Sequence, residues 1–88
     1  MRFSIECATE EGKPDPLRRI QHHLDAKHVE LRQANPRGYL DQFEQQLEII
    51  LEEVADKIGM KVDMHTEMNG ALTARFYPQY LSKFPGND

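Results

Sequence analysis

The stretch YLDQFEQQLEIILEEVADKI, residues 39–58, carries the strongest structural signal in the chain, because its apolar side chains recur at helical spacing. An advance of about 100° per residue gathers these side chains into one stripe. The stripe contains Leu40, Phe43, Leu47, Ile50, Leu51, Val54 and Ile58. We predict one continuous helix over 39–58 that buries this stripe. Gly59 follows at the position where a left-handed C-terminal cap is commonest.

The remaining surface of this helix is acidic. We call it the acidic ridge, and its members are Asp41, Glu44, Glu48, Glu52 and Asp56, with Ile49 among them. Like charges four residues apart cost a helix about 0.2 to 0.5 kcal/mol each, so the pattern does not stabilise the helix. Two interpretations stay open. The ridge is either a solvated face rich in a strong helix former, or a surface that meets a basic partner around Ile49.

Strands are predicted on both sides of helical sequence. Apolar and polar residues alternate over 1–8, over 61–67 and over 72–77, the last two separated by Asn69-Gly70. A three-residue loop, 68–70 with a left-handed Gly70, keeps the apolar side chains of both strands on one face. It sets Val62 opposite Phe76, Met64 opposite Ala74, Asp63 opposite Arg75 and His65 opposite Thr73. A two-residue loop would split the apolar side chains between two faces, so we predict the longer loop.

A second helix is predicted over 16–34. Asp15 followed by Pro16 is a helix-start signal, and Asn35-Pro36 ends the helix near Ala34 and can open the next one. One face of this helix contains Leu17, Ile20, Leu24, His28 and Leu31. His28 is then a histidine at the edge of the core, or alternatively a pH-sensitive packing element.

These elements predict a single α+β domain over 1–88 with the order β-α-α-β-β. A helical hairpin covers one face of a three-stranded sheet. The inner face of the sheet contains Phe3, Ile5, Val62, Met64, Leu72 and Phe76. Strand order stays open. The tail over 78–88 is expected to form one helical turn docked on the core, or otherwise an exposed aromatic patch.

Charge is unevenly distributed along the 88 residues, whose net charge is −4. Residues 16–38 carry five Lys or Arg against two acids, and residues 39–58 carry one Lys against six acids. A single cysteine, Cys7, favours a reducing compartment, and the start of the chain lacks an apolar signal region. We therefore expect a cytoplasmic protein that does not bind membranes.

Catalytic and metal-binding chemistry has little support in the sequence. His22, Asp25 and His28 follow one another at steps of three, which drift around a helix instead of facing one ion. Cys7 is expected to point inward as a small hydrophobic side chain, and no glycine-rich phosphate loop occurs. We expect no enzymatic activity, no metal and no cofactor.

The function that we expect is non-catalytic protein binding, with the acidic ridge engaging a basic surface. By analogy of size and charge alone, the chain is in the format of small regulators and inhibitors of nucleic-acid enzymes, including phage proteins that occupy DNA-binding grooves. The alternative is a nucleic-acid-binding module that uses Arg18, Arg19, His22, His23 and Arg37. A small enzyme or metal-binding protein comes third. The bipolar charge also suggests a homodimer.

Overall fold

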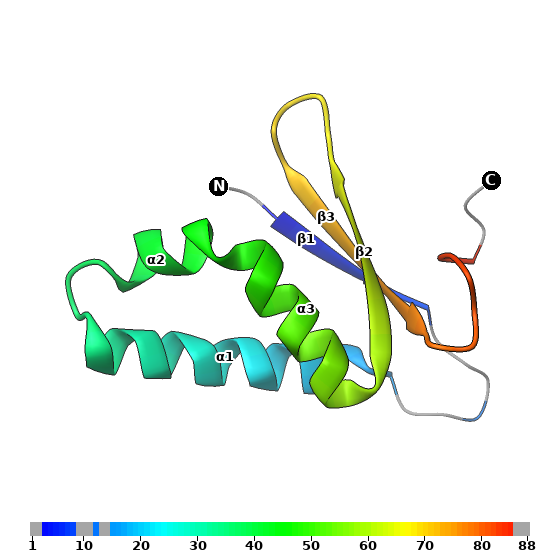
Figure 1. The fold of residues 1–88 in the computed structure, drawn as a ribbon, viewed down its shortest axis with the longest axis horizontal. Helices are drawn as coiled ribbons and strands as arrows, with labels where there is room; N and C mark the ends of the chain where they lie inside the picture. Colours follow the sequence, from blue (N-terminus) through cyan, green and yellow to red (C-terminus); the bar gives the residue numbers. More distant parts are fainter. Residues whose placement is uncertain (1–2, 9–11, 13–14, 86–88) are drawn as a thin grey trace.

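The computed structural model describes residues 3–8, 12 and 15–85. The helices lie on one face of a sheet and the C-terminal segment lies on the other (Figure 1). The elements are β1 (Phe3–Cys7), α1 (Leu17–Ala34), α2 (Tyr39–Gln45), α3 (Leu47–Ile58), β2 (Met60–Thr66) and β3 (Leu72–Pro78). The predicted α+β class and β-α-α-β-β order are confirmed, with the second helix divided into α2 and α3.

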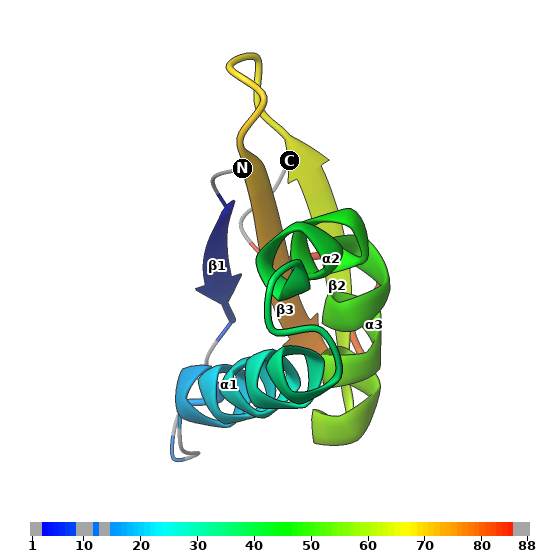
Figure 2. The ribbon, with the colours of Figure 1, turned by 90° about the vertical axis from the view of Figure 1, so that its left-hand side faces the viewer.

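Strand β3 is central, and the sheet has the order β1-β3-β2 (Figure 2). β1 runs parallel to β3, whereas β2 runs antiparallel to it. The central position buries the inner side chains of β3: Ala74 and Phe76 are 0% exposed. β1 and β2 are both edge strands, so their apolar side chains are less completely covered.

The predicted hairpin is confirmed. Asp63 lies opposite Arg75, and Val62 lies opposite Phe76. The Glu67 amide donates to the Ala71 carbonyl oxygen at 2.7 Å, which leaves residues 68–70 as the loop. Gly70 has φ +85°, the left-handed conformation that this turn requires and that glycine adopts without strain.

Helix α1 begins and ends as predicted. The Leu17 amide donates to Asp15 Oδ1 at 2.9 Å, and the helix continues to Ala34. The Gly38 amide donates to Asn35 Oδ1 at 3.1 Å, so Asn35 holds the turn before α2. Most of the predicted apolar face is buried, but Leu17, the first residue of α1, is 42% exposed.

The prediction of one continuous helix over 39–58 is wrong, because the chain bends at Gln46. This residue has φ −102° and ψ 10°, outside the helical range. Its amide still donates to the Gln42 carbonyl at 3.0 Å, and its own carbonyl accepts from the Ile50 amide at 2.9 Å. The main-chain hydrogen bonds of Gln46 are therefore kept at the bend. The bend lets α2 pack on α1 while α3 packs on β2 as well as α1. Leu40, expected in the core, is 61% exposed as a result.

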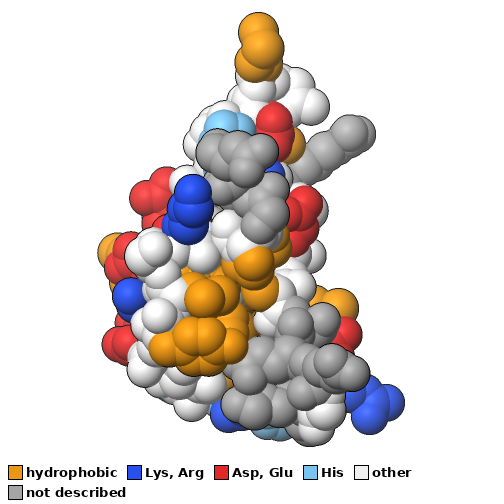
Figure 3. Space-filling model, turned by 90° about the vertical axis from the view of Figure 1, so that its right-hand side faces the viewer, with side chains coloured by type: hydrophobic (Ala, Val, Ile, Leu, Met, Phe, Trp, Pro, Cys, Tyr) orange, Lys and Arg blue, Asp and Glu red, His pale blue; other side chains and the backbone are white. Residues whose placement is uncertain are grey.

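The C-terminal segment does not form the predicted helical turn on the core. Its described part turns at Pro78, whose carbonyl accepts from the Leu81 amide at 3.1 Å, and crosses the outer face of the sheet. The Arg75 guanidinium lies 5.7 Å from the centre of the Phe84 ring. Apolar side chains gather on this side of the molecule (Figure 3). Tyr80, in the same C-terminal segment, is 73% exposed.

Candidate protein-binding surface

The acidic ridge is exposed along α3 but does not continue in a straight line. Glu48, Glu52 and Asp56 project into solvent, and Ile49 is 60% exposed beside them. Asp41 and Glu44 lie on α2, beyond the bend at Gln46, and Glu44 is half-buried. The ridge therefore has a straight part on α3 and a second part on α2.

The bend creates a groove that the sequence did not predict. Glu44 and Glu48 line the same hollow of about 460 Å³ between the helices and the hairpin. The other lining residues are Gln45, Leu47, Ile49, Thr66, Gly70 and Leu72. An exposed isoleucine and two carboxylates thus border one concave surface. The spacing of the acids was visible in the sequence, whereas the groove requires the bend and the hairpin together.

The second half of α3 borders another groove, of about 500 Å³, at the start of β2. Glu52 and Asp56 line it from the helix, and Met60, Lys61 and Val62 line it from the strand. The residues that line the two grooves show that the beginning of α3 lies near the end of β2. The end of α3 lies near the beginning of β2. The acidic residues of α3 therefore follow the free edge of β2 along its length.

Neighbouring cations do not neutralise the α3 part of the ridge. Within the part of the chain that the structure describes, ion pairs join Lys27 to Glu30 and Glu53, Arg75 to Glu6, and His65 to Glu67. None of these pairs includes Glu48, Glu52 or Asp56. The Lys27 ammonium lies 4.0 Å from Glu53 and so links α1 to the flank of α3.

The residues of the alternative nucleic-acid surface are spread along α1. Arg18, Arg19 and His22 are exposed near its start, whereas Arg37 follows its far end, about 25 Å away at 1.5 Å per residue. Burial, followed by the nearby charges of Lys57, His22 and Arg19, lowers the pKa of His23. The lowered pKa favours the neutral ring, so His23 adds little positive charge near pH 7.

His28 lies at the edge of the core, as predicted. Its ring centre is 4.1 Å from that of Phe43, and the ring centre of Phe3 is 6.4 Å from that of Phe43. These rings border a shallow, mainly apolar hollow of about 270 Å³, together with Leu40, Glu44 and Leu47. The pH-sensitive role considered for His28 stays a prediction.

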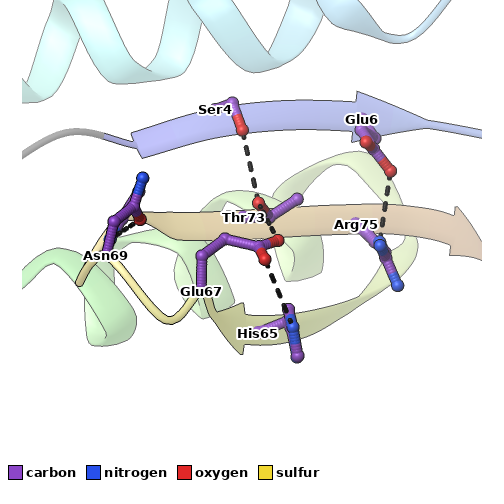
Figure 4. Close-up of polar contacts among 8 residues, drawn as sticks. Ser4, Glu6, His65, Glu67, Asn69, Thr73 and Arg75 are labelled. Carbon is purple, nitrogen blue, oxygen red and sulfur yellow. Dashed lines mark hydrogen bonds and ion pairs between the residues drawn. The ribbon is translucent and has the colours of Figure 1, made fainter.

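The outer face of the sheet carries a polar network (Figure 4). Ser4 Oγ lies 3.4 Å from Thr73 Oγ1, and the Thr73 hydroxyl donates to Glu67 at 3.4 Å. The Arg75 guanidinium donates to Glu6 at 3.1 Å, joining β3 to β1. These contacts connect strands across the sheet, and we interpret them as structural.

Metal binding by the histidines of α1 and reactivity of Cys7 had little support in the sequence. Among the described residues, no three His, Cys, Asp or Glu side chains are grouped closely enough to hold a metal ion. Burial, and secondarily the charge of Asp15, raises the pKa of the Cys7 thiol to about 11, so the thiol is protonated near neutral pH. None of the described helices is both long and apolar enough to cross a membrane.

Comparisons with protein-family models, with curated proteins and with solved structures gave no match. Function is therefore inferred from the surfaces of this chain alone.

Proposed function

We propose that this protein is a non-catalytic binding module whose acidic ridge engages a basic surface of another protein. The observation that carries the proposal is the row formed by Glu48, Glu52 and Asp56. These carboxylates are exposed and have no ion-pair partner among the described residues. Charge complementarity of this kind contributes to partner choice and to the association rate.

Ile49 supports a protein partner over a small cation. It lies beside the acids with 60% of its surface exposed, and it borders the groove that contains Glu44 and Glu48. An apolar side chain surrounded by charges can be buried at the centre of an interface while the charges form the rim. Basic surfaces are common where proteins contact nucleic-acid phosphates, so the proposed partners include proteins of that class and the proposed role includes their regulation or inhibition.

A charge-matched pair of variants tests the proposal. Glu48→Gln with Glu52→Gln removes two charges from the ridge, and Asp25→Asn with Glu30→Gln removes two from α1. Each variant is used to capture proteins from a nuclease-treated lysate, and the affinity of a recovered protein is measured at several salt concentrations. We expect the ridge variant to bind more weakly and with a shallower salt dependence, and the α1 variant to bind like the parent.

Folding must be unchanged for this comparison to hold. Glutamine keeps a high helix propensity and removes a like-charge repulsion at spacing four, so the ridge variant should be as stable as the parent or slightly more so. Unchanged affinity and unchanged salt dependence in the ridge variant would refute the proposal. Retention of the parent protein on heparin, lost on Arg18→Ala with Arg19→Ala, would instead favour the nucleic-acid alternative.

A further inference from the structure

The free edge of β2 offers main-chain hydrogen-bonding groups beside the acidic ridge. β2 pairs only with β3 in the described sheet, so its other side has no neighbouring strand. The Glu67 amide, just after β2, donates to the carbonyl of Ala71, the residue before β3, and hydrogen-bonding direction alternates along an antiparallel strand. The main-chain amides and carbonyls of Lys61, Asp63 and His65 therefore also point toward β3. Those of Val62, Met64 and Thr66 point outward, away from β3.

Apolar side chains along this edge are incompletely covered. Val62 and Met64 point toward the helices and pack against the core, but both are only half-buried. A strand added outside β2 would cover them further while pairing the main-chain groups of the same residues. Unpaired edges are common sites for the addition of an extended segment from another chain.

The acids of α3 define the chemistry of that segment. Glu48, Glu52 and Asp56 recur every four residues, which is about 6 Å along a helix. Every second side chain of an antiparallel strand recurs at about 6.8 Å on the same face. A strand beside β2 with lysine or arginine at alternate positions would thus present cations at nearly the spacing of the carboxylates.

A second copy of this chain fits the edge less well. Two copies paired through β2 would use the same surface on both sides, as twofold symmetry requires. That pairing would bring two rows of glutamate and aspartate side by side. Repulsion between these like charges disfavours pairing of two copies through β2. A basic segment at the same edge does not meet this repulsion.

We propose that the basic partner binds as an extended segment, added antiparallel to β2, with alternate Lys or Arg side chains directed at Glu48, Glu52 and Asp56. This inference rests on the proposed function and specifies the form of its partner. Residues of the segment that face these acids are also those whose amides bond to β2, because residues opposite one another in an antiparallel pair share a face. Lys61, Asp63 and His65 alternate on the other face of β2, where the charges are mixed, so the intervening residues of the segment need not be basic.

The test uses a synthetic peptide of seven residues, the length of β2, with lysine at the three even positions and valine at the others. Two further peptides carry N-methyl groups, one on the three lysine amides and one on three valine amides. All three peptides have the same charge. We expect methylation of the lysine amides to weaken binding by roughly ten-fold or more, since it removes the donors that face β2, and methylation of the valine amides to have little effect.

Hydrogen exchange provides the second readout. The amides of Val62, Met64 and Thr66 should exchange rapidly in the free protein and become protected when the unmethylated peptide binds. Those of Asp63 and His65 should change little, because β3 already protects them.

The outcomes separate this inference from the proposed function. Equal affinity of the two methylated peptides, with no new protection at Val62, Met64 or Thr66, would overturn strand addition. No measurable binding of the unmethylated peptide at low salt would overturn it too. If the peptide binds without strand addition, and Glu48→Gln with Glu52→Gln weakens that binding, the proposed function still stands. If that double variant binds the peptide as tightly as the parent, the proposed function fails as well.

Discussion

Two adjacent isoleucines on α3 allow a direct test of which surface of the helix is buried. Ile50 is 1% exposed and Ile49 is 60% exposed, so replacing each with alanine makes the same chemical change in opposite environments. The substitution removes three carbon groups, worth about 2.4 kcal/mol when fully buried at about 0.8 kcal/mol per group. It also gains about 0.4 kcal/mol of helix propensity at either position.

For Ile50→Ala, a cavity adds about 1 to 2 kcal/mol to the loss, and after the propensity gain the total destabilisation is about 3 to 4 kcal/mol. For Ile49→Ala, the buried two-fifths of the side chain corresponds to about 1 kcal/mol, and the propensity gain reduces the loss to about 0.5 kcal/mol. A chain of 88 residues is expected to have about 4 to 13 kcal/mol of stability in total. The Ile50 substitution therefore removes a large part of it.

Urea unfolding followed by far-ultraviolet circular dichroism measures both losses. The midpoint should fall clearly for Ile50→Ala and little for Ile49→Ala, with an unchanged slope for both. A loss of about 3 kcal/mol should also lower the melting temperature by roughly 12 to 24 °C. Equal losses at the two positions would refute the assignment of the α3 surfaces. A loss at Ile49 that grows with protein concentration would show that the ridge is buried against a second copy.

Further predictions concern a helix cap and two groups with shifted pKa values. Gly59→Ala should destabilise the protein by about 1 to 2 kcal/mol in urea unfolding. The cost is conformational, because φ is +72° at this position and the added Cβ meets no other atom. Gly59→Asn should cost less, and equal costs for the two variants would contradict a conformational cause. Cys7 should react with iodoacetamide at pH 8 far more slowly in the native protein than in urea, since a rise in pKa from 9.0 to about 11 leaves about 100-fold less thiolate. Burial is the main reason why the pKa of Tyr77 is raised. The charge of Asp63, and the hydrogen bond that the Tyr77 hydroxyl donates to Asp63 at 3.2 Å, raise it further. The native form of Tyr77 holds the proton more tightly than the unfolded chain, so stability should fall as the pH rises above about 10, and Tyr77→Phe should flatten that decline.

Local sequence signals determined most of the elements and the hairpin register. Asp15-Pro16 and Asn35-Pro36 mark the ends of α1, and Gly59 adopts the left-handed cap that its position after Ile58 predicts. The hairpin register followed from keeping the apolar side chains of two strands on one face, a condition that involves neighbouring segments only. These features depend on short-range geometry, so the sequence contains enough information to predict them.

The strand order, the bend at Gln46 and the two grooves depended on tertiary structure. Alternation in β1 is the same whether it pairs with β2 or β3, so it carries no information about order. Gln46 has an ordinary helix propensity and neither glycine nor proline adjoins it, yet α2 and α3 pack against different partners and the chain bends between them. The acids of α3 were recognisable from their spacing in the sequence. That they follow an unpaired strand edge was not, because their neighbours there lie on β2 and in the hairpin, and only packing brings those segments together.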